Sequence, residues 1–156
     1  MQYDKYESPM GPLWLQGEGG VLTGLSFEGE CTAAGMQAAA DEFILVKGWL
    51  DDYFRGQPRQ PDFPMSPAGT AFQRLVWKLL LEIPFGQTRT YGDLAGETAR
   101  IMGKEKMSPQ AVGQAVGRNP IAIIIPCHRI IGAGGKLTGY YGGIHRKQWL
   151  LDHEGR

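Results

Sequence analysis

Residues 119–130 read Asn-Pro-Ile-Ala-Ile-Ile-Ile-Pro-Cys-His-Arg-Ile and are the most informative part of this sequence. The centre of the stretch, residues 121–125, is an apolar run rich in isoleucine and bounded by Pro120 and Pro126. Such a run is typical of a buried strand. The sequence therefore predicts a buried strand that ends directly before Cys127.

The residues after Cys127 indicate a reactive thiol. His128 and Arg129 can both carry positive charge, and neighbouring cations lower the pKa of a thiol from about 8.5. We therefore expect Cys127 to be a nucleophile that is partly ionised at neutral pH. Adjacent side chains of a strand point to opposite faces, so His128 would reach the sulfur through a turn or a water. An inert core cysteine is the alternative that these residues leave open.

The other cysteine, Cys31, follows the acidic run Glu28-Gly29-Glu30 near a predicted turn. We interpret it as an ordinary unreactive thiol. Neither cysteine has the Cys-x-x-Cys or Cys/His spacing of a metal site, and the two lie in dissimilar contexts. We therefore expect no disulfide framework, no structural metal and no cofactor.

Helices are predicted before and after the isoleucine run. From Thr70 to Ile83, apolar residues recur at intervals of three and four, which predicts an amphipathic helix that stops at Pro84. Thr90 can cap a helix that continues to Ile101, and Ser108 with Pro109 can open another that continues to Val116. These two short helices together indicate a helix-turn-helix, and a last helix is predicted over residues 146–153.

The helix predicted after Ser108 is rich in small residues, namely Ala111, Gly113, Ala115 and Gly117. Small side chains allow another surface to approach closely. That surface can be a neighbouring helix or the groove of a nucleic acid, and the sequence alone leaves both open.

The first half of the chain is predicted to be a small α+β region. Residues 12–15 and 21–27 alternate with glycine turns and are typical of the strands of a β-hairpin. Helical segments are predicted over residues 33–40 and 42–53, the latter from its apolar spacing.

Residues 56–68 contain Pro58, Pro61, Pro64 and Pro67 among polar residues, too many prolines for regular structure. This composition predicts a linker. We therefore expect a domain boundary there, with domains at residues 1–66 and 67–156.

Charge is distributed unevenly between the halves although the formal net charge is zero. Residues 1–71 contain four Lys/Arg and ten Asp/Glu, whereas residues 72–156 contain twelve Lys/Arg and six Asp/Glu. This asymmetry indicates that the second half faces a phosphate backbone, or else that the two halves attract each other. No apolar stretch predicts a membrane span or a signal peptide, so we expect a cytoplasmic protein, or a nuclear one in a eukaryote.

The motifs around Cys127 resemble those of the O6-alkylguanine-DNA alkyltransferases. The similarity covers the second half closely and the first half more loosely. The matching stretches are residues 8–13, 22–27, 72–77, 83–86, 90–95, 119–130, 139–143 and 150–155. The resemblance implies an α+β fold, with a small N-terminal α/β domain of the ribonuclease H-like type and a mostly helical, winged helix-turn-helix C-terminal domain. The second domain would bind DNA and carry the alkyl-accepting cysteine.

The resemblance implies direct-reversal DNA repair. An alkyl group, typically methyl, would move from O6 of guanine in double-stranded DNA to Cys127, with O4-alkylthymine as a further candidate substrate. Because O6 lies inside the base stack, the base must be flipped out, here from the minor groove. A thioether is a poor leaving group, so the transfer is irreversible and each protein repairs one lesion. We expect a monomer that clusters on DNA.

The resemblance also implies catalytic roles at matching positions. Cys127 would be the acceptor, His128 would withdraw its proton through a water, and Glu154 would orient the imidazole. Asn119 would hold the turn before the active-site strand. Tyr91 would crowd the phosphate 3′ to the lesion and donate to the departing guanine.

Further residues are implied to bind the substrate and the DNA. The two tyrosines of the 139–143 stretch would wall the alkyl pocket, and Arg129 would pin the site. The implied substrate-binding residues are Tyr140, Tyr141, Gly142, Ile130, Arg129 and Lys147, and the implied DNA-binding residues are Tyr91, Gly92, Gln110, Ala111, Gly113 and Arg118.

The chain departs from the family pattern at Gln110, where an arginine usually serves as the wedge that replaces the flipped base. Glutamine can hydrogen-bond the orphaned cytosine but brings no charge and no guanidinium stacking. Base flipping would then be less efficient, or Arg118 or Arg100 would compensate. The zinc ligands of some family members are also missing, because the first half contains no histidine.

Other functions fit parts of the sequence. A non-catalytic alkyltransferase-like protein recognises damage but lacks the acceptor, so Cys127 argues against it. A hydrolase with a Cys-His pair requires turnover and an oxyanion hole, which the sequence does not indicate. A regulator that is methylated as a signal would need a further regulatory domain.

Overall fold

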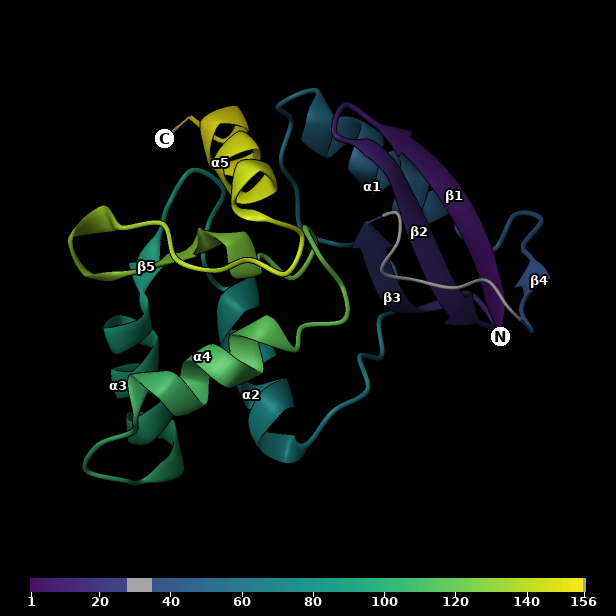
Figure 1. Ribbon diagram of the computed structural model, residues 1–156. Coiled ribbons are helices and arrows are strands. Elements are labelled where there is room, and N and C mark those ends of the chain that lie inside the picture. Colours follow the sequence, from purple (N-terminus) through teal and green to yellow (C-terminus); the bar gives the residue numbers. More distant parts are fainter. Residues whose placement is uncertain (28–34, 156) are drawn as a thin grey trace. The chain divides into compact units, whose positions relative to one another are not determined.

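The computed structural model describes residues 1–27 and 35–155, and the chain divides into two units (Figure 1). The first unit comprises residues 1–68 together with the short segment 120–122. The second unit comprises residues 69–119 and 123–156. The proline-rich residues 56–68 have little regular structure and form the last part of the first unit before residue 69.

The sheet of the first unit has the strand order β3-β2-β1-β4. The strands are β1 (Gln2–Ser8), β2 (Gly11–Glu18), β3 (Val21–Phe27) and β4 (Gln37–Ala38). β2 pairs antiparallel with both β1 and β3, while β4 pairs parallel with β1. The predicted hairpin is confirmed as β2 and β3, and Gly19 and Gly20 between them both have positive φ, which a two-residue hairpin loop favours.

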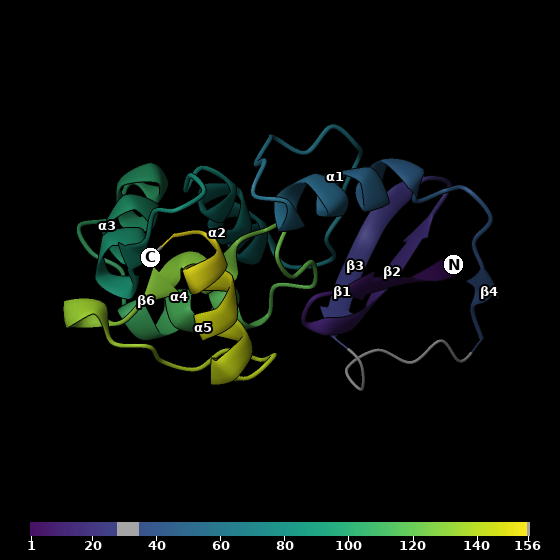
Figure 2. The ribbon, with the colours of Figure 1, turned by 90° about the horizontal axis from the view of Figure 1, so that it is seen from above.

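Helix α1 (Ile44–Phe54) covers one face of this sheet (Figure 2). Its buried residues are Val46, Trp49, Leu50 and Tyr53, which confirms the predicted helical spacing. At the edge of this face, Lys47 Nζ lies 2.6 Å from Asp4 Oδ2, and Tyr6 donates a hydrogen bond of 2.6 Å to Asp51.

The helix predicted over residues 33–40 is wrong in the part that the structure describes. Residues 37–38 form β4, because Gln37 N donates to Met1 O and Ala39 N donates to Tyr3 O along the open edge of β1. Gly35 has a φ of +77°, which also interrupts a right-handed helix. Cys31 lies outside the described residues.

Helices form most of the second unit. Its elements are α2 (Ala71–Leu81), β5 (Arg89–Thr90), α3 (Tyr91–Met102), α4 (Pro109–Gly117), the 3-10 helix η1 (Cys127–Arg129), β6 (Ile130–Ile131), the 3-10 helix η2 (Ala133–Gly135) and α5 (Ile144–His153). The helix starts predicted at Thr70, Thr90 and Ser108 are confirmed, whereas the last helix begins at Ile144 instead of residue 146. Thr70 and Thr90 form capping boxes with Gln73 and Asp93, and the Ser108 hydroxyl accepts from two backbone N–H groups of α4.

The helices of the second unit pack on one another through α2. Trp77 of α2 is buried, and its indole N–H donates a hydrogen bond of 2.8 Å to the Ala115 carbonyl of α4. Val76, Leu94 and Val112 bring α2, α3 and α4 into the same core. The predicted α+β fold, a sheet domain followed by a helical domain, is therefore confirmed.

The strand predicted over residues 121–125 is wrong, although the burial predicted for it is confirmed. Ile121 forms an isolated bridge with Leu25, outside any named strand, and Ile123 has a φ of +69°, a left-handed conformation that is rare for a β-branched residue. Prolines at both ends cannot donate to a sheet ladder, and the run turns at Ile123 instead of continuing extended. It therefore forms a buried turn.

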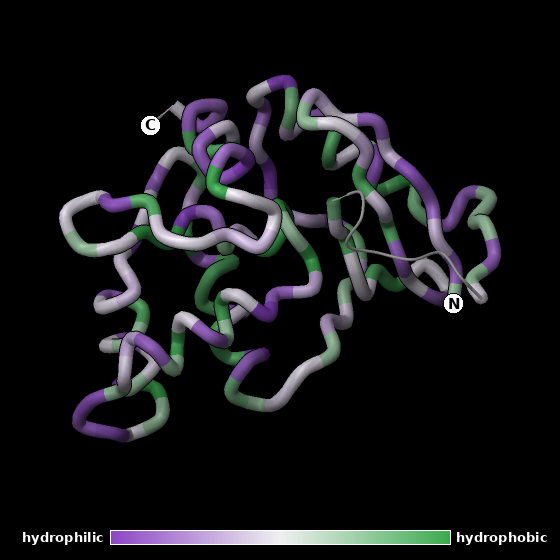
Figure 3. Tube along the Cα trace, viewed as in Figure 1, coloured by the Kyte–Doolittle hydropathy of each residue, from purple (hydrophilic) through white to green (hydrophobic). Residues whose placement is uncertain are grey.

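Apolar and polar residues are interspersed along the elements of each unit (Figure 3). Among the residues that the structure describes, no helix has both the length and the apolar character needed to cross a bilayer.

Candidate active site

Cys127 opens the 3-10 helix η1 and lines a cavity of about 610 Å³ within the second unit. Its side chain is 2% exposed. Residues of α3 and α4 form one wall of this cavity, and the loop 138–141 forms another; the lining includes Tyr91, Gln110, Gly113, Thr138, Tyr140 and Tyr141. A cavity of this size is within the usual range of small-molecule sites. The sulfur is therefore buried but borders a space that a ligand can enter.

The Cys127 thiol is protonated at rest, so the expectation of a partly ionised thiolate is wrong. Burial raises its pKa to about 11, although hydrogen bonds from Asn119 and Tyr140 and the charge of Lys147 act in the opposite direction. The cation of the neighbouring Arg129 is paired with Glu154. Desolvation therefore outweighs the positive surroundings.

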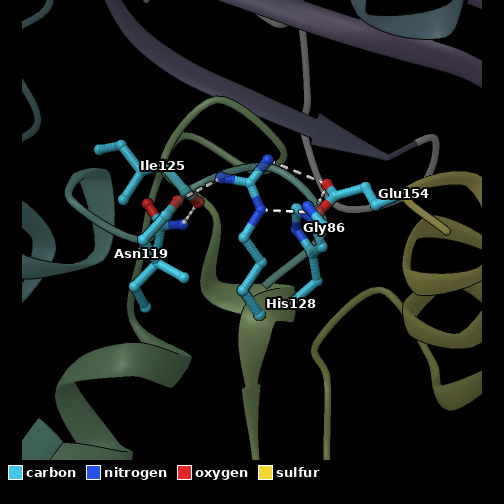
Figure 4. A network of polar contacts seen from close by, with 7 residues as sticks. Gly86, Asn119, Ile125, His128 and Glu154 are labelled. Atoms are coloured by element: carbon cyan, nitrogen blue, oxygen red, sulfur yellow. Dashed lines mark hydrogen bonds and ion pairs between the residues drawn. The ribbon is translucent and has the colours of Figure 1, made fainter. Parts of the chain in front are cut away.

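The two residues after Cys127 share one carboxylate, that of Glu154 (Figure 4). His128 Nε2 lies 2.7 Å from Glu154 Oε2. Arg129 binds both oxygens of the same carboxylate, with Nε 2.8 Å from Oε1 and Nη2 3.0 Å from Oε2. All three side chains are buried, so the fork of the guanidinium supplies the counter-charge that a buried carboxylate needs.

These contacts determine the protonation of His128. Burial would raise the pKa of Glu154, but the hydrogen bonds and charges of His128 and Arg129 hold it well below its usual range. Burial lowers the pKa of His128, and the nearby Glu154 offsets this only in part. The imidazole is therefore neutral, and its Nε2–H donates to the carboxylate. Nδ1 is then an acceptor, and it is buried without a hydrogen-bond partner among the described residues.

Asn119 connects the end of α4 to the residues before Cys127. Its side-chain amide donates a hydrogen bond of 2.8 Å to the carbonyl of Ile125, and its backbone N–H donates to Val116 of α4 (Figure 4). The same side chain also hydrogen-bonds the Cys127 thiol. Asn119 is buried, and the Ile125 carbonyl also accepts from the Cys127 N–H over 2.8 Å, so the Asn119 amide shares this acceptor with the backbone of the cysteine.

Contacts among Lys147, Thr138 and Tyr91 connect the loop 138–141 to the start of α3. The buried Lys147 donates a hydrogen bond of 3.3 Å to the Thr138 carbonyl, and its Nζ lies 6.0 Å from the centre of the Tyr91 ring. The Thr138 hydroxyl donates to the Tyr91 hydroxyl over 3.3 Å. Sequence reasoning missed Thr138, because no motif or spacing distinguishes it from other loop residues.

The structure brings some of the predicted substrate-binding residues to the cavity and not others. Tyr140 and Tyr141 line it, with ring centres 5.3 Å apart. Ile130 is fully buried in β6, Arg129 binds Glu154, Lys147 binds the Thr138 carbonyl, and the Gly142 carbonyl accepts from Arg146; none of these four lines the cavity.

The predicted DNA-binding residues are likewise divided. Tyr91, Gln110 and Gly113 line the cavity, whereas Gly92, Ala111 and Arg118 do not. A Cβ placed on Gly113 would lie 3.5 Å from the Tyr91 ring, an ordinary contact distance, so α4 passes close to the start of α3 at this residue. Gln110, Gly92 and Arg118 are exposed.

Among the described residues, no cluster of three or more His, Cys, Asp or Glu side chains is arranged to hold a metal ion. The side chains around Cys127 are instead suited to moving a proton and to enclosing an organic group.

Comparison with known protein families identifies both halves of the chain. Residues 1–67 match the family model described as "6-O-methylguanine DNA methyltransferase, ribonuclease-like domain". Residues 71–156 match the model described as "6-O-methylguanine DNA methyltransferase, DNA binding domain".

Curated relatives match over nearly the whole chain. A Mycobacterium bovis protein named methylated-DNA–protein-cysteine methyltransferase is 45% identical, and the alignment covers 99% of this chain and 92% of the relative. A Methanosarcina acetivorans protein of the same name is 43% identical, with 99% of each chain covered. Among solved structures, Mycobacterium tuberculosis OGT in complex with DNA has a TM-score of 0.89 and 44% identity, covering 99% of this chain and 92% of that one.

Proposed function

Because the chain belongs to the 6-O-methylguanine DNA methyltransferase family, we propose that it repairs DNA directly, by transferring the methyl group of O6-methylguanine to Cys127. The observation that carries this proposal is the position of Cys127, whose buried thiol borders the cavity between α3, α4 and the loop 138–141.

The transfer is a displacement at the methyl carbon. The bond from the Cys127 sulfur to carbon forms while the bond from carbon to O6 breaks, and the bonding electrons leave with the guanine. The thiol proton passes to Nδ1 of His128 through a water, the departing guanine takes up one proton from solvent, and His128 returns its proton to solvent, so that the thiol proton is balanced by the one on guanine. Donation from the Tyr91 hydroxyl, which borders the cavity, stabilises the charge that develops on the base.

The neutral thiol makes a base necessary. With a pKa of about 11, Cys127 is almost entirely protonated at neutral pH, so it must lose its proton as the sulfur attacks. His128 is neutral, and its Nδ1 is free to accept because Nε2–H is committed to Glu154. The ionised Glu154 stabilises the imidazolium that forms, while Arg129 fixes the orientation of the carboxylate.

The substrate reaches the sulfur as an extrahelical base. O6 lies within the stack of a duplex, so the nucleotide must rotate into the cavity. The small residue Gly113 and the exposed Gln110 lie on the cavity wall, and α4 would lie in the minor groove with Gln110 filling the vacated space. The product thioether has no route back to the thiol, so one molecule repairs one lesion.

Further parts of the proposal concern the state and place of the protein. We propose that it acts as a monomer that clusters along duplex DNA. We also propose that it works in the cytoplasm, or in the nucleus if the source is eukaryotic. O4-alkylthymine would be a second substrate because it presents an alkylated oxygen at a similar position.

Incubation with a duplex that carries O6-methylguanine labelled in its methyl group tests the function. Label should attach covalently to the protein, with at most one equivalent bound, and Cys127→Ser should abolish attachment while Cys31→Ser should not. Catalytic turnover would instead indicate a hydrolase, and tight binding without label would indicate a damage-recognition protein.

A further inference from the structure

We propose that the turn formed by residues 83–86, Ile-Pro-Phe-Gly, is a positioning element that sets the Glu154 carboxylate against His128. The inference rests on the proposed function, because it assigns this turn a part in the methyl transfer. The turn follows α2, and Gly86 lies 68 residues before Glu154 in the sequence.

Both ends of the turn bind the buried ion pair through their backbone. The Gly86 N–H donates a hydrogen bond of 3.2 Å to Glu154 Oε1, and the two residues lie side by side in Figure 4. The Ile83 carbonyl accepts a hydrogen bond of 2.7 Å from Arg129 Nη1. Backbone groups cannot rotate away as side chains can. The turn therefore holds the carboxylate and the guanidinium in one fixed arrangement.

The middle of the turn adds an aromatic contact. The Phe85 ring lies 5.9 Å from the guanidinium carbon of Arg129, within cation–π range. The Phe85 ring also contacts His153, whose ring meets it edge-on at a centroid distance of 6.2 Å and stacks on Trp149 at 5.1 Å. Phe85 thus contacts both the ion pair and the last turn of α5. That turn ends at His153, the residue before Glu154.

Gly86 is required by the conformation of the turn. Within and just after this segment, Gln87 N donates to Pro84 O and closes a β-turn over residues 84–87, in which Gly86 is the third residue and has a φ of +82°. This position of a type II turn favours glycine. A Cβ on Gly86 would also lie 3.0 Å from the backbone oxygen of Glu154. A side chain here would require the Glu154 backbone to shift by a few tenths of an ångström, in addition to the strain of the positive φ.

The consequence for the reaction concerns the imidazole proton. Glu154 Oε2 faces His128 Nε2 at 2.7 Å, so a fixed carboxylate keeps the proton on Nε2 and leaves Nδ1 as the acceptor. The charged and titratable groups that act on His128 are Glu154, Arg129 and Lys147, and Cys127 precedes it in the chain. A displaced carboxylate would release the ring to exchange its proton between the two nitrogens.

The test compares Gly86→Ala with Gly103→Ala in the full-length protein. Gly103 also has a positive φ, +69°, but no atom lies within 4 Å of a Cβ built on it, so this variant reproduces the backbone strain alone. Phe85→Leu is a second probe that retains the backbone turn. Two quantities are measured: the tautomer of His128 from the ¹⁵N shifts of its ring, and the rate of reaction with free O6-benzylguanine as a function of pH.

We expect His128 to be the Nε2–H tautomer in the unaltered protein and in Gly103→Ala, but a mixture in Gly86→Ala. The neutral-pH rate of Gly86→Ala should fall by about tenfold or more, because general-base catalysis contributes roughly 10²–10⁴. Its rate should then rise with pH towards the thiol pKa of about 11, whereas the unaltered protein levels off near neutrality. Phe85→Leu should show the same changes to a smaller extent.

Retention of the Nε2–H tautomer and of the unaltered pH profile in Gly86→Ala would overturn the positioning role. Equal loss in Gly103→Ala would also overturn it, since strain alone would then explain the effect. If the unaltered protein does not react with any O6-alkylguanine, the proposed function fails. The tautomer comparison would still decide whether the turn positions Glu154.

Discussion

Replacement of Glu154 by glutamine removes the one carboxylate that both His128 and Arg129 contact. The change is nearly isosteric, so packing around the 6% exposed side chain should be preserved. Arg129, itself 8% exposed, keeps its charge, but only one of the two side-chain oxygens that it contacts at 2.8 and 3.0 Å remains an acceptor, and that oxygen is uncharged. A buried cation is then left without a counter-charge.

The cost of this change can be estimated from buried ion pairs in general. Removing one partner of such a pair costs about 3–5 kcal/mol, because the other charge stays buried and uncompensated. A typical domain is stable by only about 5–15 kcal/mol, so the loss is a large part of the total. For a chain of this size the melting temperature Tm should fall by roughly 6–20 °C.

Differential scanning calorimetry at neutral pH measures the effect. The matched control is Glu97→Gln, which removes an exposed carboxylate that lies 3.5 Å from Arg100, and it should change Tm by no more than about 2 °C. In the double variant Arg129→Met with Glu154→Gln, both charges are absent, so its Tm should fall by less than the sum of the decreases in the two single variants. If the Tm of Glu154→Gln equals that of Glu97→Gln, the Glu154 carboxylate does not stabilise the buried Arg129 cation, and the reasoning is refuted.

Other expected outcomes concern pH, base flipping and the recognition helix. The folded-state pKa values of His128 and Glu154 are both lowered, so the unfolded chain binds more protons, and Tm should fall as pH drops below about 6.5 and again below about 4.3; His128→Gln should flatten the first step, and an unchanged first step would contradict the assignment. Gln110→Arg should speed repair of duplex DNA more than reaction with free O6-benzylguanine, and equal effects would exclude a part in flipping. Gly113→Ala should stabilise α4 by roughly 0.8–1 kcal/mol, since the new methyl group meets Tyr91 at an ordinary 3.5 Å, yet slow the duplex reaction by crowding the cavity; a lower Tm would contradict this packing.

Local signals predicted much of the second unit. Thr70, Thr90 and Ser108 each bring their own hydrogen-bond acceptor to the start of a helix, so these boundaries depend on residues within three positions. The signal for the hairpin of β2 and β3 in the first unit was also local, because Gly19 and Gly20 adopt the positive φ that its turn needs.

Features that depend on distant partners were not predictable in this way. Residues 37–38 became a strand because the edge of β1 offered hydrogen bonds, and the isoleucine run turned at Ile123 although its composition favours an extended strand. β1 itself was missed, since its residues show no clear alternation of apolar and polar side chains.

The site followed the same division. The neighbours of Cys127 in the sequence indicated a nucleophile. The protonation of its thiol, however, depends on burial and on the contacts of the residues around it. The carboxylate that binds Arg129 belongs to Glu154, which is 25 residues further along the chain. The resemblance to a family supplied Glu154 where spacing could not. The contributions of Thr138 and of the turn at Gly86 became visible only in three dimensions.

Mass spectrometry of the protein after reaction with excess O6-methylguanine duplex tests most directly whether Cys127 is the methyl acceptor. We predict that the intact mass rises by one CH₂ and no more, and that peptide analysis places the addition on the fragment containing Cys127. Disappearance of O6-methylguanine with no change in protein mass, or a methyl group located on Cys31, would contradict the proposed function.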